Sequence, residues 1–435
     1  MVGLEVEMFT LDTSGNMINS ADLLIKKIKE KEPNIDIKKE CAHNMVELGS
    51  FPSTSIPNTV SNLLQNIETL LHYAEKEDIV ICPLGTYPGK FTPKMRTDPN
   101  YKMKMEIFGK KRFEIAGRCI GFHCHYTMPW GVFDIKKLNL KQLIISKNKE
   151  SLVNSYNLLI AMDPALTSFM QCSPFYQGKF IGKNSRVIVY RGSKNLRYPR
   201  GLYTNYPAFG SLQGYMYTGT DLINYISNKY VKWKNLLLSL GMNIKTISQY
   251  GSILDTTWNP IKVNAHGTLE ERGMDINHPL QILSASTLIS TLLKKVQEEY
   301  IDVIPSDIGI NEPFKFENNK IYIPPDSHVR TKLQRFSAYQ GFDSDLVYNY
   351  CKRLLKLVQL FITKEEAPFI EPFENMLKEK KTVSDQIIAS AKKKGYSIKD
   401  ELPQAVAAEI ALNHSKRLFK EIVLTRKLIE NVPIL

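Results

Sequence analysis

The sequence predicts an α+β protein in which an antiparallel sheet is flanked by helices. Strand-like and helical segments are mixed without the regular strand–helix–strand rhythm of a parallel sheet. The 435 residues are 43% hydrophobic, which is enough for a large core. From about residue 345 the pattern is helical almost throughout. We therefore expect a main domain over 1–345, the catalytic one if the protein is an enzyme, and a helical region over 346–435 packed on it.

Helices are predicted where apolar residues recur every three or four positions, and strands where they alternate with polar ones. The N-terminal half is then expected to contain a strand at 1–10, a helix at 20–31 with Ser20 as its N-cap, a clear amphipathic helix at 59–77, a buried strand at 78–86, a charged helical segment at 97–114 and a strand carrying two histidines at 121–127. The next elements are an apolar helix at 150–170 that Pro164 kinks or breaks, a strand at 185–192, a long ordered loop at 193–218, a helix at 221–241 and strand pattern at 261–275.

The composition limits the class of partner. The net charge of +13 favours a lysine-rich solvated surface or an anionic substrate such as a nucleotide. A nucleic-acid binder would cluster its basic residues with stacking aromatic residues, whereas the lysines here are interleaved with acids, so we expect no nucleic-acid partner. No apolar run is long enough for a membrane span. The expected partners are small-molecule substrates, and a homo-oligomer is compatible with the sequence.

The cysteines indicate the compartment. Six are scattered without a pairing rhythm, and the N-terminal residues start directly in strand pattern without the features of a signal peptide. We therefore expect a cytoplasmic protein.

Several predicted strands carry ionisable side chains on one face and apolar side chains on the other, because successive side chains of a strand point to opposite faces. The ionisable faces hold Glu5 and Glu7, Glu47, His123 with His125, and Thr268 with Glu270 and Arg272; in the predicted strand at 185–192, Arg191 shares a face with Val187 and Val189.

Any single pair is explained well by a solvated sheet face, and a lone His-x-His is also a common spacing in metal sites. Two glutamates at i and i+2 repel each other unless a cation compensates them. Together, the strands are better explained by one polar cavity filled with cations. Carboxylates outnumber imidazoles, which favours Mg²⁺ or Mn²⁺ over structural zinc. Arginines beside metals in a basic protein suggest phosphoryl transfer from a nucleotide, although no Walker motif or kinase-type glycine loop is present.

Six motifs, "GLEVEMF", "VELGSF", "GTYPG", "GFHCHYTMP", "CSPFYQGKFIGKNSR" and "TWNPIKVNAHGTLEERGMD", occur in an order that resembles the type 2 glutamate–cysteine ligase and carboxylate–amine ligase family. The resemblance covers about residues 1–280. It implies a glutamine synthetase-like fold, in which a curved antiparallel sheet forms a funnel holding ATP and two or three Mg²⁺ ions. It also implies that a carboxylate reacts with ATP to give an acyl phosphate, which an amine attacks to form an amide.

By position, the resemblance implies that the metal ligands are Glu5, Glu7, Glu47, His123 and Glu270. It implies that His125 contacts the nucleotide or its metal, and that Arg272, with Arg191 or Arg186, meets the transferred phosphoryl group. Glu270, Arg191 and Arg272 would thus carry the catalysis. The motifs depart from the family pattern at "GTYP" for GTHP, "GFHCH" for GLHVH and "SPFYQG" for SPFWQG, which puts the substrate fit in question more than the chemistry.

Other residues have two interpretations each. Arg112 and Arg118 could grip a glutamate α-carboxylate through a bidentate fork, and Arg112 could equally be a surface residue. Tyr176 and Gln177 could hold the substrate, or order a turn. We expect Cys124 and Trp258 in the core.

Three functions compete on the sequence alone. The first is glutamate–cysteine ligase, with a ligase for another amine as the enzymatic alternative. The second is a catalytically weak relative that binds metal or nucleotide. The third is a zinc hydrolase using His-x-His, which lacks an HExxH helix and has too many carboxylates.

Overall fold

The centre of the protein is a seven-stranded sheet. The computed structural model describes residues 1–142, 146–249 and 253–431. The strands run in the order β10-β11-β5-β1-β3-β2, with β4 also paired to β1, and every pairing is antiparallel. Their bounds are β1 (Val2–Leu11), β2 (Ile37–Lys39), β3 (Met45–Gly49), β4 (Val80–Cys82), β5 (Gly121–Thr127), β10 (Ile261–Asn264) and β11 (Thr268–Asp275). Short pairings outside this sheet are made by β6 (Phe133–Asp134), β7 (Asn139–Leu140), β8 (Phe175–Tyr176), β9 (Lys179–Phe180), β12 (Asp302–Pro305), β13 (Lys315–Glu317) and β14 (Lys320–Ile323).

Helices make up most of the rest. Those that precede residue 300 are α1 (Ala21–Lys31), α2 (Ile56–Glu75), α3 (Pro99–Phe108), α4 (Lys110–Phe113), α5 (Lys147–Phe169), α6 (Ser185–Arg191), α7 (Gly219–Ser239), α8 (Ile244–Ser248) and α9 (Pro279–Glu298). Those that follow are α10 (Ile308–Asn311), α11 (Asp326–His328), α12 (Gln334–Gln340), α13 (Asp345–Phe361), α14 (Glu371–Glu379), α15 (Val383–Lys393) and α16 (Gln404–Glu430).

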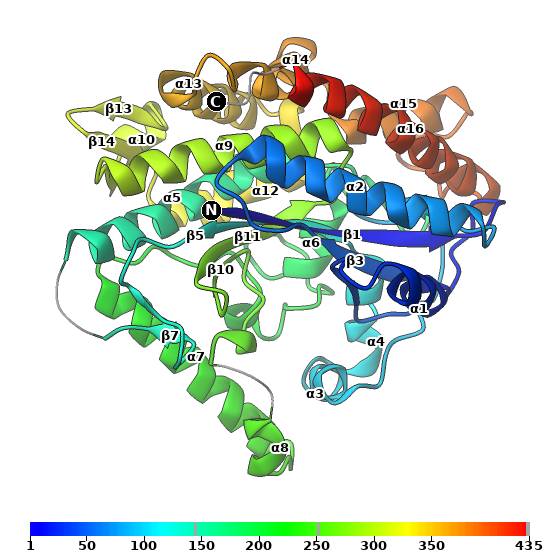
Figure 1. The fold of residues 1–435 in the computed structure, drawn as a ribbon, viewed down its shortest axis with the longest axis horizontal. Helices are drawn as coiled ribbons and strands as arrows, with labels where there is room; N and C mark the ends of the chain where they lie inside the picture. Colours follow the sequence, from blue (N-terminus) through cyan, green and yellow to red (C-terminus); the bar gives the residue numbers. More distant parts are fainter. Residues whose placement is uncertain (143–145, 250–252, 432–435) are drawn as a thin grey trace.

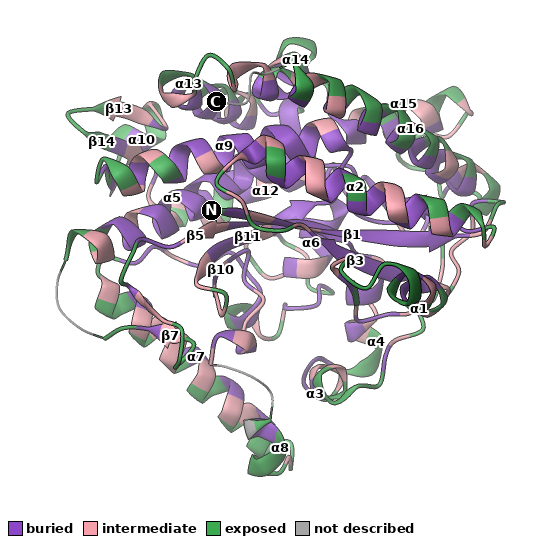
Figure 2. Ribbon diagram, viewed as in Figure 1, coloured by how far each residue is buried: buried purple, intermediate pink, exposed green. Residues whose placement is uncertain are grey.

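The two faces of the sheet have different neighbours. On one side α2 and α9 lie along the sheet, with α13, α14 and α16 beyond them, while α3, α4, α7 and α8 lie on the other side (Figure 1). The side chains of Leu4, Val6 and Met8 are completely buried, and α2 and α9 contact β1 and β5. The sheet, α5 and α9 are largely buried, and α8 is largely exposed (Figure 2). The apolar sides of the strands therefore build the core, and their ionisable sides face α3 and α7.

The predicted strand at 185–192 is wrong, because this segment is the helix α6. Its β-branched residues suggested a strand, but Asn184 caps the helix by accepting a hydrogen bond from the backbone N–H of Val187 at 2.9 Å. Burial of the apolar residues overrides their intrinsic strand preference. In the helix Arg186 and Tyr190 share a side at the i, i+4 spacing, and Arg191 does not lie on a strand face with Val187 and Val189.

Three smaller expectations are corrected. The buried strand at 78–86 shortens to β4, since the chain turns away at the "GTYPG" segment. Ser20 precedes α1 but its side chain makes no capping hydrogen bond. Pro164 lies inside α5 without ending it, and its carbonyl accepts hydrogen bonds from Ser168 and Ser337. The remaining predicted elements are present, with ends shifted by a few residues.

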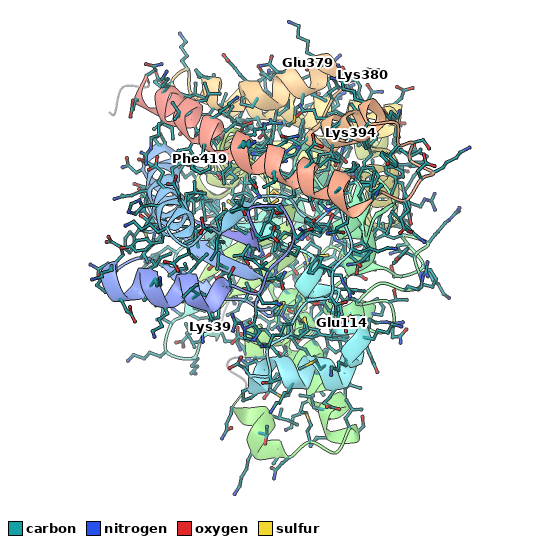
Figure 3. All side chains as sticks on the ribbon, turned by 90° about the vertical axis from the view of Figure 1, so that its right-hand side faces the viewer. Lys39, Glu114, Glu379, Lys380, Lys394 and Phe419 are labelled. Carbon is teal, nitrogen blue, oxygen red and sulfur yellow. The ribbon has the colours of Figure 1, made fainter. Side chains whose placement is uncertain are left out.

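The last ninety residues are helical as predicted, apart from 432–435, which lie outside the described part. Helix α16 packs against α9 and β4. Its outer side presents Phe419, which is 53% exposed (Figure 3). The division of the chain at residue 345 stays a prediction. No helix in the described ranges is long and apolar enough to cross a membrane.

A pair of buried histidines joins α16 to the start of α9. His278 Nε2 and His414 Nδ1 are 2.9 Å apart, and the two rings are stacked. Burial, followed by the neighbouring charges, lowers the pKa of both, that of His414 to about 3. The pair is therefore neutral in the folded protein at neutral pH.

We predict that acid lowers the free energy of unfolding through this histidine pair. An unfolded histidine binds a proton near pH 6.5, whereas folded His414 resists protonation until about pH 3. The contribution of His414 to stability is therefore complete above pH 6.5 and is lost as the pH falls below it, by about 1.4 kcal/mol per pH unit. Urea unfolding at pH 7.5 and 5.5 measures this, with His414→Gln as the comparison. The variant should lose about 1 kcal/mol less than the natural protein over this interval, and equal losses would contradict the prediction.

Candidate active site

The strand register brings the ionisable residues together in three rows across the sheet. Each row consists of residues that are directly opposite one another on neighbouring strands. The rows are Lys38–Glu47–Glu7, Glu5–His123, and His125–Glu270–Lys262. Residues opposite each other have their side chains about 5 Å apart, so the rows form one continuous polar surface.

The side chains of this surface contact one another. Glu5 Oε2 lies 3.3 Å from His123 Nδ1 and 3.4 Å from His125 Nε2. His123 also lies 3.9 Å from Glu7 and 3.8 Å from Glu270. All but Glu5, which is half-buried, are buried. The five residues that the sequence grouped on separate strands thus meet at one place.

Glu40 also belongs to this surface, although the sequence did not point to it. One oxygen each of Glu7, Glu40 and Glu47 lie within 4.8 Å of one another. Glu40 directly follows β2 and shares the i, i+2 spacing with Lys38, whose ammonium lies 3.5 Å from Glu47. That spacing was a usable signal, but a three-residue strand is too short for its alternation to stand out from the sequence.

The carboxylates at one end of the surface are charged. Burial alone would raise the pKa of Glu5, but hydrogen bonds from His123 and His125 outweigh it and hold the pKa well below its usual range. Burial likewise opposes the charge of Glu270, and Arg272 lowers its pKa nonetheless. Burial lowers the pKa of His123, whereas the charges of Glu270 and Glu5 raise that of His125.

At the other end, burial dominates and repulsion adds to it. Burial raises the pKa of Glu7 and Glu47, and burial together with the charge of Glu7 raises that of Glu40 to about 7. Without a further cation, these three carboxylates relieve their repulsion by holding protons.

The donor set fits a hard divalent ion. The three groups whose donor atoms lie within 4.8 Å combine carboxylate oxygens with one imidazole at most, and they are Glu5 with His125 and Glu270, Glu5 with Glu47 and His123, and Glu7 with Glu40 and Glu47. Oxygen-rich sets of this kind suit Mg²⁺ or Mn²⁺, whereas structural zinc sites are built mostly from cysteine and histidine. The thiol of Cys124 lies in the core on the other side of the sheet, opposite Glu271, as expected.

Three arginines, Arg186, Arg191 and Arg272, border a small cavity of about 30 Å³ next to the carboxylates, lined also by Glu7 and His123. Arg272 Nη1 lies 3.5 Å from Glu270, and a register shift after Glu271 redirects the strand at this residue. Arg186 reaches the same place from α6 and donates a hydrogen bond to the carbonyl of Gly273 at 3.1 Å. A Cβ at Gly121 would lie only 2.3 Å from the Arg186 guanidinium, so the glycine makes room for it.

The comparisons with known proteins agree with this geometry. The family model described as Glutamate-cysteine ligase family 2 (GCS2) matches residues 1–308. The chain belongs to this family.

Curated relatives are distant. "Putative glutamate--cysteine ligase 2" of Chromobacterium violaceum is 25% identical over 182 residues, which cover 41% of this chain and 42% of the relative. The protein of the same name from Chloroflexus aggregans is 22% identical over 193 residues, covering 43% of this chain and 44% of the relative. This chain thus spans under half the length of the curated relatives that it matches.

Two solved structures share the fold. A glutamate–cysteine ligase from Francisella tularensis in complex with AMP has a TM-score of 0.57 at 15% identity, covering 100% of this chain and 95% of that one. A bifunctional glutathione synthetase from Pasteurella multocida has the same TM-score of 0.57 at 12% identity, covering 99% of this chain and 56% of that one. The fold predicted from the sequence, an antiparallel sheet of glutamine synthetase-like type with a helical C-terminal region, is confirmed.

Within this GCS2 site, Arg191 is already engaged. Its guanidinium donates hydrogen bonds to both carboxylate oxygens of Asp163, at 2.7 and 2.6 Å, and to Gln334 at 2.9 Å. A Cβ at Gly273 would come within 2.4 Å of Arg191 and 2.5 Å of Asp163. Arg191 therefore borders the cavity with its guanidinium committed to Asp163 and Gln334, whereas Arg186 bonds only to backbone carbonyls.

The four residues predicted for the substrate do not line this cavity. Arg118 donates to Glu114 at 2.8 Å and to the carbonyl of Phe91, and Gln177 donates to the same carbonyl at 2.9 Å. Tyr176 lies near Arg118, and Arg112 is half-buried on α4. Glu114 lies at the surface of the same segment (Figure 3). The substrate role of these four residues stays a prediction.

Trp258 corrects another expectation. It is half-buried and borders the cavity rather than filling the core. Its ring stacks with that of Tyr203, and the ammonium of Lys104, from α3, lies 4.3 Å from its centroid. A lone tryptophan gives no sequence signal that separates a site wall from a core.

We predict that Glu40 is needed for divalent-ion binding. Glu40→Gln removes one of three mutually repelling carboxylates, so the metal-free variant should melt at the same temperature or higher. The stabilisation that Mg²⁺ or Mn²⁺ gives should require about tenfold more metal or disappear. Thermal melts over a metal titration measure both. Glu106→Gln, exposed on α3, is the matched control, and an unchanged metal response in Glu40→Gln would exclude Glu40 from the site.

We also predict that Cys124→Ser leaves the stabilisation by Mg²⁺ or Mn²⁺ unchanged, because the thiol faces away from the carboxylates. The buried hydroxyl costs stability by about 1–3 kcal/mol, which a chemical unfolding curve would show. Loss of the metal response, or one tightly held zinc per chain by elemental analysis, would instead support the zinc-hydrolase hypothesis.

Proposed function

We propose that this protein is an ATP-dependent ligase that joins glutamate to an amine through an acyl phosphate, with L-cysteine as the acceptor. The observation that carries the proposal is the three-row surface of carboxylates and imidazoles with Arg272 and Arg186 beside it. Its position in a GCS2 chain supports glutamate as the acid. The AMP bound to the Francisella tularensis ligase supports an adenine nucleotide as the phosphoryl donor.

The proposed reaction has two steps. An oxygen of the glutamate γ-carboxylate attacks the terminal phosphorus of ATP, and ADP leaves. The amine nitrogen then attacks the acyl carbon, loses a proton, and inorganic phosphate leaves. Arg272 and Arg186 are placed to neutralise the negative charge that develops on the phosphoryl oxygens.

The carboxylates would hold two or three divalent ions. We assign Glu5, Glu47 and His123 to one position, Glu5, Glu270 and His125 to a second, and Glu7, Glu40 and Glu47 to a third, following the groups described above. When bound, Mg²⁺ would supply positive charge beside the phosphates of ATP. Part of the negative charge of the carboxylates is balanced by side chains of the protein. Lys38 lies 3.3 Å from Glu5, and Arg272 lies 3.5 Å from Glu270.

The proposal includes the setting of the enzyme. The six cysteines are all unpaired and buried, which supports a cytoplasmic location. We also keep the division into a catalytic domain over 1–345 and a helical cover over 346–435, because α16 packs on the layer that backs the sheet.

The test is phosphate release from ATP with Mg²⁺ and L-glutamate, with L-cysteine as the first amine. We expect release only when both substrates are present, with γ-glutamylcysteine detected by mass spectrometry. Release with glutamate and a different amine would keep the mechanism and change the acceptor. No release with any pair, from a folded protein that still binds ATP, would reject the ligase and favour a binding relative.

Two variants assign the activity to the site. Glu7→Gln and His123→Ala should each reduce turnover by at least about 100-fold, since each removes a group next to the transferring phosphoryl. Glu106→Gln should be normal. Circular dichroism and melting temperature check that the variants fold, and near-normal turnover by either would remove that residue from the site.

A further inference from the structure

Lys104, on α3, reaches the edge of the cavity by way of Trp258, which borders it. Lys104 Nζ lies 4.3 Å from the ring centroid of Trp258 and 5.3 Å from that of Tyr101. Phe108, from the same helix, packs edge-on against Trp258 and Tyr203. We call these five residues the aromatic wall; it joins α3 to the segments before β10 and after α6.

Lys104 differs from the other lysines of the site. Within the described part of the chain, Lys38 and Lys262 form ion pairs with carboxylates of the sheet, whereas Lys104 forms none. Burial lowers the pKa of Lys104 to about 8, so it is still mostly protonated at neutral pH. Glu40 attracts this half-buried ammonium through its charge. Among the described residues, however, Lys104 makes no side-chain hydrogen bond, and its contacts are with ring faces, so its donors can bind a partner.

The chemistry of the reaction limits what that partner is. In the proposed ligase the phosphoryl group would lie against Arg272 and Arg186, which border the cavity, so the amine must approach the acyl carbon from elsewhere. An amine beside Glu5 or Glu47 would be held as a charged, non-nucleophilic ammonium ion. Beside Lys104 and Arg272 the neutral, nucleophilic form is favoured. The aromatic wall also offers apolar surface for a side chain.

We propose that the aromatic wall is the acceptor subsite, and that Lys104 selects acceptors carrying a carboxylate, that is α-amino acids rather than simple amines. This inference rests on the proposed ligase function. The acceptor carboxylate would receive charge-assisted hydrogen bonds from Lys104, and its amine would be turned toward the cavity that Trp258 and Arg272 border. The cavity of about 30 Å³ is too small for this, so the wall must move outward when the acceptor binds.

The test compares each amino acid with its decarboxylated partner: L-cysteine with cysteamine, L-alanine with ethylamine, and glycine with methylamine. Phosphate release is measured with ATP, Mg²⁺ and L-glutamate. The natural protein should prefer the amino acid of each pair. Lys104→Met should raise the KM for the amino acid by about 10- to 100-fold and that for the plain amine by less than about threefold, because only the charge-assisted bond is lost. The KM for ATP and for glutamate should be unchanged.

Two further variants separate selection from structure. Lys104→Arg keeps the charge and should keep most of the preference. Lys102→Met, exposed on the same helix, should behave as the natural protein. A Lys104→Met effect that falls equally on both members of a pair, or on the KM for ATP or glutamate, overturns the subsite assignment while leaving the ligase intact. Absence of phosphate release by the natural protein with every acceptor rejects the ligase and this inference together.

Discussion

The register of β1 is the constraint on which the rest of the structure depends. Its side chains alternate between a completely buried apolar row and the glutamates that meet His123 and Glu47 on the neighbouring strands. A slip of one residue would move Glu5 and Glu7 into the core and expose the apolar row. Both the apolar side and the glutamate side of β1 therefore disfavour a shifted register. Contacts of the carboxylates with the histidines and with Lys38 reduce the repulsion that this register creates among the glutamates.

The arginines require space that the strands provide through glycine. A side chain at Gly121 would occupy the position of the Arg186 guanidinium, and one at Gly273 would occupy that of Arg191. Arg191 is held beside the bend of β11 by Asp163 on α5, a fully buried ion pair with Gln334 as an additional acceptor. Such a pair contributes little net stability, since desolvation offsets its attraction. The backbone of the bend is held by Arg186, which donates hydrogen bonds to the carbonyls of Gly273 and Arg272.

From the sequence, the part of the site that follows the two-residue alternation of long strands could be predicted, but the rest could not. Glu5 with Glu7, His123 with His125, and Glu270 with Arg272 could be placed on common faces because each pair lies two residues apart on a long strand. Glu40 was not placed, since it follows a strand of only three residues, which is too short for its alternation to stand out. The same local reasoning failed at α6, where β-branched residues suggested a strand and only the cap at Asn184 and tertiary burial decide for a helix.

The chemistry of amide formation explains why the cavity has two unlike sides. A triphosphate needs cations beside it, and carboxylates on the protein bind those cations. The side that holds the phosphoryl donor is therefore rich in carboxylates. An attacking amine needs the opposite, since negative charge keeps it protonated and inert. One surface cannot satisfy both. In the proposed ligase the sheet supplies the first side, and Lys104 on α3 with Trp258 before β10 supplies the second.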